Sequence, residues 1–231
     1  AAVIDHSWGF LFSLKAVVSR SAVAYNVLKA NESGKPQAGR LTAHTGTTME
    51  SLAGNFLIST PQMPDPRFQR QVIYLCAHND EGAMGLVINN PNPELTLFDV
   101  FHGANLAIPE GPLPPVYMGG PVEMESGFIL FTSREEDRYA IEVTPGIYVS
   151  RDARLLEDIS QGQGPREFLF MLGYAGWGAG QLEGELIDNS WLTVPADLDV
   201  LFRTPDEEKW ARAARTFGID IATFGDTIGY A

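Results

Sequence analysis

The stretch GYAGWGAGQLEGELIDNSW, residues 173–191, constrains the fold more than any other part of the chain. It sets four glycines and a tryptophan directly before the apolar pattern of an amphipathic helix. A glycine costs about 1 kcal/mol relative to alanine inside a helix, so a regular helix is disfavoured here. We predict a tight bend that uses positive φ angles, or a close backbone approach to Trp177, to a neighbouring strand or to a ligand.

The length and charge of the chain limit both its organisation and its partners. A chain of 231 residues with 45% hydrophobic composition can bury a substantial core, and one domain is expected. The net charge is -13, and residues 1–48 carry five basic and two acidic residues, or 5 - 2 = +3, which leaves -13 - 3 = -16 for the remainder. Lys209 is the only lysine in that remainder. A broad phosphate-neutralising surface is therefore not expected, and the sequence predicts no direct nucleic-acid partner.

Cysteine content and hydropathy favour a cytoplasmic protein without a membrane partner. Cys76 is the only cysteine, which excludes a disulfide within the chain and a cysteine-based zinc site. The apolar run at residues 8–18 contains Lys15 and is too short to span a bilayer. Residues 1–48 fit either an upstream extension before Met49 or a targeting sequence. We expect an N-terminal extension and linker over residues 1–50 and one folded domain over 51–231.

Short runs rich in branched and aromatic residues predict a sheet with closely spaced, antiparallel strands. Strands are expected at 55–59, 71–77, 83–89, 116–118, 127–132, 139–143, 147–150, 167–172 and 199–202. The cluster Asn79-Asp80-Glu81-Gly82 favours a turn that joins two of these strands in a hairpin.

Three amphipathic helices are expected between the strands. Thr204 as N-cap, Pro205 and Glu207 predict one that Gly218 ends, and Leu155 and Leu182 lie in the apolar faces of the other two. Strands with scattered helices predict an α+β fold, a single domain with a mixed, largely antiparallel sheet.

Three segments together resemble the YqgE/AlgH family. They are FLISTPQMPDPRFQRQVIYLCAHNDEGAMGLVINN at 56–90, MGGPVE at 118–123 and GYAGWGAGQLEGEL at 173–186. The resemblance covers nearly all of residues 51–231. It implies a sheet curled toward a barrel in a bacterial cytoplasmic protein, and some members have been called putative transcriptional regulators. It supplies no agreed catalytic or ligand-binding residues.

A cysteine, a histidine and two carboxylates follow one another closely at the end of a predicted strand. Cys76, His78, Asp80 and Glu81 include metal-ligand types, and strand alternation would place Cys76 and His78 on one face. A lone cysteine is more often a small buried hydrophobe, and acidic turn residues are usually solvated. The prediction is no metal and no cofactor.

The glycine-rich motifs give the candidate site. Residues 176–180 have the spacing GxGxG rather than GxGxxG, no Walker lysine follows, and Glu183 and Glu185 would repel phosphate. A structural turn is favoured there and at Gly119-Gly120-Pro121 over a ligand loop. If these segments bind a ligand or partner, the candidate residues are Gly119, Gly120, Pro121, Trp177, Gly178 and Gln181. No catalytic residue is predicted, because no GxSxG elbow is present.

The sequence favours a non-enzymatic regulatory protein that acts through a protein partner or through self-association. The alternative is a small-molecule-binding domain or an enzyme with a pocket near residues 173–181. A regulator that binds DNA directly ranks third. We also expect valine at Gly178 to cost about 1 to 3 kcal/mol, if the bend needs positive φ or a surface free of side chains.

Overall fold

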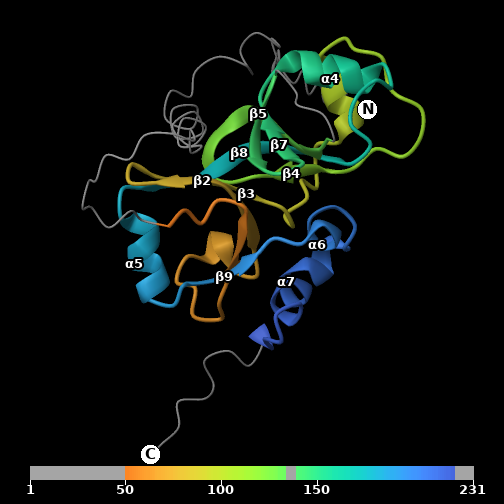
Figure 1. Ribbon diagram of the computed structural model, residues 1–231. Coiled ribbons are helices and arrows are strands. Elements are labelled where there is room, and N and C mark those ends of the chain that lie inside the picture. Colours follow the sequence, from red (N-terminus) through yellow and green to blue (C-terminus); the bar gives the residue numbers. More distant parts are fainter. Residues whose placement is uncertain (1–49, 134–138, 222–231) are drawn as a thin grey trace, which may run out of the picture.

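The computed structural model describes residues 50–133 and 139–221, which form an α+β domain (Figure 1). Its strands are β1 (Asn55–Ser59), β2 (Val72–Asn79), β3 (Gly82–Val87), β4 (Val116–Met118), β5 (Val122–Thr132), β6 (Ala140–Thr144), β7 (Ile147–Ser150), β8 (Phe168–Gly178) and β9 (Trp191–Pro195). Its helices are the 3-10 turn η1 (Pro66–Phe68) and the α-helices α3 (Leu97–Gly103), α4 (Ala153–Ser160), α5 (Gln181–Ile187), α6 (Leu198–Phe202) and α7 (Asp206–Arg215).

The strands form one curled sheet in the order β6-β7-β5-β8-β3-β2-β1-β9, and β4 also pairs with β8. Only the β4–β8 pair is parallel among the described strands. The predicted α+β class, single domain and mixed, largely antiparallel sheet are therefore confirmed, as a half-barrel. The hairpin across Asn79 and Gly82 is also confirmed, with these two residues paired at its end.

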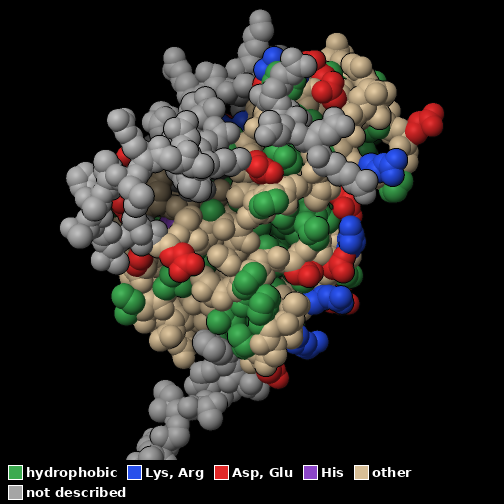
Figure 2. Space-filling view, in the orientation of Figure 1, with side chains coloured by type: hydrophobic (Ala, Val, Ile, Leu, Met, Phe, Trp, Pro, Cys, Tyr) green, Lys and Arg blue, Asp and Glu red, His purple; other side chains and the backbone are tan. Residues whose placement is uncertain are grey.

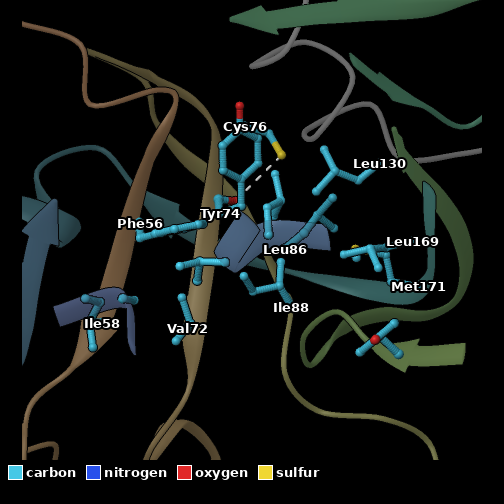
Figure 3. Packing of buried hydrophobic residues seen from close by; sticks show 14 of the residues in the cluster. Phe56, Ile58, Val72, Tyr74, Cys76, Leu86, Ile88, Leu130, Leu169 and Met171 are labelled. Carbon is cyan, nitrogen blue, oxygen red and sulfur yellow. Dashed lines mark hydrogen bonds between the residues drawn. The ribbon is translucent and has the colours of Figure 1, made fainter. Parts of the chain in front are cut away.

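Three apolar clusters pack against the sheet. The largest lies inside the curl, where residues of β1, β2, β3, β5 and β8 meet α6 and α7 (Figure 3). On the outer surface, α3 and α4 cover the end of the sheet formed by β5, β7 and β8. The third cluster lies under α5 and contains Leu182, Trp177 and Trp191. Figure 1 shows α4, α5 and the α6–α7 pair on three separate sides of the sheet.

The predicted bend at residues 173–181 is wrong for most of its length, because β8 continues as a strand to Gly178. Gly173 has a φ of 70° and interrupts the alternation of the strand. Met171 points into the inner cluster, and so does Tyr174 three residues later. Trp177 consequently faces the third cluster, which lies beneath α5. The bend itself is confined to Ala179 and Gly180, and Gly180 has a φ of 73°.

Glycines allow the chain to cross β8 at van der Waals distance. The segment between β4 and β5 passes over β8, and a Cβ on Gly120 would lie 2.1 Å from the carbonyl carbon of Tyr174 and 2.3 Å from the nitrogen of Ala175. A Cβ on Gly119 would lie 2.4 Å from the carbonyl oxygen of Gly173. The structural turn predicted at Gly119-Gly120-Pro121 is therefore a crossing instead, and these two glycines serve a close backbone approach.

The predicted strand at 199–202 is wrong, because this segment is the helix α6. A short run of branched and aromatic residues does not separate strand from helix, and here the side chain of Asp197 decides. It accepts a hydrogen bond of 3.0 Å from the backbone N–H of Val200 and so caps the helix. The helix α3, with a capping box between Thr96 and Asp99, was not predicted.

Helix α7 was predicted, but Thr204 is not its N-cap. The hydroxyl of Thr204 donates to the carbonyl of Asp199, and the helix begins after Pro205 without a side-chain cap. Lys209 of this helix is 2% exposed, and its Nζ donates to the carbonyl oxygen of Ile88 at 2.7 Å. Nζ also lies 2.8 Å from Asp206 Oδ1. Burial lowers the pKa of Lys209, and Asp206 opposes that shift.

None of the helices in the described ranges combines the length and apolar character needed to cross a bilayer. The predicted extension and linker over residues 1–50 lie almost entirely outside the described residues, so that boundary remains a prediction.

Candidate functional site

A pocket of about 470 Å³ opens where the end of β8 meets α5, η1 and the start of β9. Its walls come from the segment before η1, from the crossing segment before β5 and from α5. The lining residues include Pro64, Asp65, Arg67, Phe68, Pro121, Gly176, Trp177, Gln181, Glu185, Asp188 and Trp191. The glycine-rich end of β8 thus forms one wall of a cavity, although most of it is strand rather than bend.

Glu185 holds two tryptophans at the base of this pocket. Its Oε2 accepts hydrogen bonds from Nε1 of Trp177 at 2.9 Å and from Nε1 of Trp191 at 2.7 Å. Its Oε1 accepts a bond of 2.9 Å from the side-chain amide of Gln181. The two indole rings meet edge to face, with centroids 6.1 Å apart. One carboxylate therefore fixes the orientation of two large aromatic side chains before any ligand is bound.

The opposite wall carries an ion pair and a third aromatic ring. Arg67 lies 2.6 Å from Asp65 through Nη2 and Oδ2, and this hydrogen bond lowers the pKa of Asp65 below its ordinary value. The ring of Phe68 packs edge to face on Trp191, with centroids 5.7 Å apart. The pocket thus combines aromatic walls with a rim that is charged and partly exposed.

The structure brings three of the six candidate residues together. Pro121, Trp177 and Gln181 all line the pocket. Gly178 lies beside it and donates its backbone N–H to Oε1 of Gln181 at 3.1 Å. Gly119 and Gly120 lie at the crossing over β8, outside the lining.

The two reasons offered for the cost of valine at Gly178 are both absent. Gly178 is not among the residues with positive φ, and a Cβ there would meet only Oε1 of Gln181, at 4.0 Å. The position is exposed and extended, where valine is favoured over glycine. We now expect Gly178→Val to leave stability within about 0.5 kcal/mol of wild type.

The predicted grouping of Cys76 with His78 is wrong. A bulge in the β2–β3 ladder between Leu75 and Ala77 shifts the alternation by one residue. Cys76 consequently packs in the inner cluster, where burial raises the pKa of its thiol. His78 turns outward to α5, with Nε2 2.7 Å from Oε1 of Glu183. Within the described ranges, no group of three or more His, Cys, Asp or Glu side chains could hold a metal ion.

His78 ties α5 to the start of the domain. Its Nδ1 accepts the backbone N–H of Leu52 at 3.0 Å, so Nε2 carries the proton and donates to Glu183. The hydroxyl of Ser51 also donates to the carbonyl oxygen of His78, at 2.9 Å. His78 therefore serves as a structural link, and it positions the helix that forms one wall of the pocket.

The central group of the pocket, Glu185, was not predicted as a site residue, because in the sequence it stands out only as a charge that repels phosphate. A signal was available, because buried indole N–H groups usually find an acceptor. Trp177 is 7% exposed and Trp191 is 4% exposed. Two such donors on either side of a short acidic helix point to a shared carboxylate, although only the fold shows which one.

Replacing Glu185 by glutamine is expected to lower the free energy of unfolding by about 1 to 2 kcal/mol. The carbonyl oxygen of a glutamine here can accept both indole N–H groups only if its own NH₂ faces the NH₂ of Gln181. The hydrogen bond to Gln181 is then lost. Urea denaturation followed by tryptophan fluorescence measures the loss. Glu208→Gln, on the exposed face of α7, is the matched control and should unfold like wild type. Equal midpoints for the two variants would show that Glu185 does not order the tryptophans.

Comparison with known proteins places this architecture in a family. The sequence model described as AlgH-like matches residues 56–222. A UPF0301 protein of Desulfotalea psychrophila is 47% identical over 188 residues, which cover 81% of this chain and 99% of that protein. A UPF0301 protein of Hahella chejuensis is 44% identical over 185 residues, covering 80% of this chain and 99% of that protein.

Two solved structures share the fold. The solution structure of the AlgH protein from Pseudomonas aeruginosa superimposes with a TM-score of 0.63 at 39% identity, covering 83% of this chain and all of that one. A crystal structure of protein DIP2367 from Corynebacterium diphtheriae has a TM-score of 0.60 over 79% of this chain and 94% of that one; at 17% identity it supports the fold alone. The extent of the sequence match, the two full-length relatives and the shared half-barrel together show that this chain belongs to the AlgH-like family.

Proposed function

We propose that this protein is a non-enzymatic binding protein of the bacterial cytoplasm that recruits a protein partner through the pocket around Trp177, Glu185 and Trp191. Any influence on transcription would then be indirect. The observation that carries the proposal is the pair of tryptophans that Glu185 holds in place. Rigid aromatic side chains at the base of a pocket are typical anchors of protein interfaces, because little conformational entropy is lost when a partner binds.

The surroundings of the pocket support a protein partner. Pro64 and Pro121 on its walls are exposed, and Ile187, next to the lining residue Asp188, is 79% exposed. A central aromatic group within a partly apolar, partly charged surface matches the composition of interface cores and rims. A pocket of about 470 Å³ would also accept a small molecule, so a metabolite is the alternative occupant.

Site-specific photocrosslinking in the native host tests the proposal. A photoreactive amino acid replaces Gln181 in the pocket or, as a control, Glu208 on the exposed face of α7. We expect one defined protein adduct from position 181 that is absent from position 208. An adduct with a second copy of this chain would support self-association as the form of recruitment.

The same experiment can reject the proposal. Identical adducts from both positions, or no adduct from position 181, would contradict a partner site at the pocket. A metabolite that raises the melting temperature of wild type, but not of the Glu185→Gln variant, would replace the protein partner by a small ligand.

We expect no binding of duplex DNA at physiological salt. The residues after 48 carry a net charge of -13 - 3 = -16, and their one lysine, Lys209, is buried and paired. On the face shown in Figure 2, basic side chains are interspersed with acidic ones and form no continuous stripe. Fluorescence anisotropy with a labelled duplex measures the affinity. A submicromolar dissociation constant at that salt would make direct DNA binding the better explanation.

A further inference from the structure

The wall of the pocket formed by β8 is an unpaired strand edge. From Ala175 to Gly178, β8 pairs with β3 on one side. On the other side its pairing with β5 ends at Tyr174, and no strand among the described residues continues it. Gly176 and Gly178 are exposed and present backbone without side chains. Such an edge is where an extended peptide can add a strand through main-chain hydrogen bonds.

A side chain already occupies this edge in the manner of a peptide group. The carboxamide of Gln181 accepts the N–H of Gly178 at 3.1 Å and donates to Glu185 at 2.9 Å. A backbone peptide unit also has one C=O acceptor and one N–H donor. An incoming strand can therefore replace both hydrogen bonds that the carboxamide makes. The side chain of Gln181 thus connects the strand edge to the pocket, and a bound peptide can take its place.

The charge of the pocket indicates which side chains a bound strand should carry. Its ionisable lining groups are Asp65, Arg67, Glu185 and Asp188, which sum to one positive and three negative charges. Arg67 is paired with Asp65, so the excess negative charge lies with Glu185 and Asp188. Carboxylates beside tryptophan rings favour a cationic group, by charge and by cation–π attraction.

We propose that the occupant is an extended, basic segment of another protein. The segment adds a short strand to the edge of β8 between Ala175 and Gly178 and places a lysine or arginine side chain in the pocket. A second copy of this chain is a poor occupant, because each whole copy carries a net charge of -13. This assignment rests on the proposed function of the pocket and specifies its partner.

Selection from a displayed library of random decapeptides against the full chain tests the assignment. We expect selected peptides to share a lysine or arginine at one position. Its replacement by norleucine should weaken binding about tenfold, as should Asp188→Lys in the protein. Glu208→Lys, an equal change of charge on α7, should leave the affinity unchanged within error. In amide NMR spectra, bound peptide should shift the Gly176 and Gly178 signals and both indole N–H signals.

The outcomes separate this inference from the proposed function. Peptides without basic residues that still shift the indole signals would overturn the basic segment but leave the pocket as a partner site. No selected peptide, or peptides insensitive to Asp188→Lys, would also overturn it. Failure of the proposed function appears separately, as loss of the specific adduct at position 181 in cells, which does not depend on the charge of any peptide.

Discussion

Alanine at Gly120 is expected to lower the free energy of unfolding by more than about 4 kcal/mol, or to prevent folding altogether. The new Cβ would lie 2.1 Å from the carbonyl carbon of Tyr174 and 2.3 Å from the nitrogen of Ala175. Both atoms belong to the backbone of β8, where Tyr174 pairs with β5 and Ala175 pairs with β3, so neither can move away without breaking a ladder. Circular dichroism and urea unfolding of the purified variant measure the effect.

Gly178→Ala is the matched control, since it adds the same methyl group to another glycine of the region. Its Cβ would meet only the side chain of Gln181, at 4.0 Å. We expect stability within about 0.5 kcal/mol of wild type. Equal losses from the two substitutions would show that glycine at these positions acts through the unfolded chain and not through the crossing.

Alanine at Lys209 is expected to cost about 3 to 5 kcal/mol, the loss usual when one partner of a buried ion pair is removed. The carbonyl oxygen of Ile88 would lose the donor that lies 2.7 Å away, and Asp206 would lose its cation. The hydroxyl of Tyr117 also donates to Asp206, so the network joins α7 to β4 and to the segment that follows β3. Urea unfolding followed by circular dichroism gives the change in free energy.

Lys209→Met separates packing from charge at the same position. Methionine fills much of the volume of the buried lysine stem but provides no donor for Ile88. We expect it to recover the packing part of the loss and to remain less stable than wild type. A stability for Lys209→Ala within about 0.5 kcal/mol of wild type would contradict the network as the anchor of α7.

Elements with long periodic patterns could be predicted from the sequence. Elements whose conformation depends on a side-chain cap or on contact with another segment could not. The apolar face of α7, with Trp210 and Ala213, is visible in the spacing alone. The segment from Leu198 to Phe202 has too few residues to show a period, and the cap from Asp197 makes it a helix. The alternation of β8 was not predictable, because the positive φ of Gly173 serves contacts with a segment distant in sequence.

The position of the candidate site could be predicted from the sequence, but most of the residues that form it could not. The glycine-rich block directed attention to Trp177 and Gln181, which do line the pocket. The rest of the site forms only where β9, α5 and η1 meet in the fold, which brings Trp191 into contact with Glu185 and Phe68. Local pattern identifies unusual backbone, whereas the chemistry of a pocket depends on side chains that approach from several segments.

The order of the strands also has a consequence for how the chain folds. β1 lies between β2, its neighbour in sequence, and β9, which follows nearly the whole of the described domain. The edge of β1 therefore stays unpaired on the ribosome until β9 has emerged, and the crossing over β8 cannot be fixed before β8 is made. Closing such long loops, and not forming the short helices, sets the folding rate of the domain. Until then the nascent chain presents a bare apolar strand to chaperones and to other nascent chains.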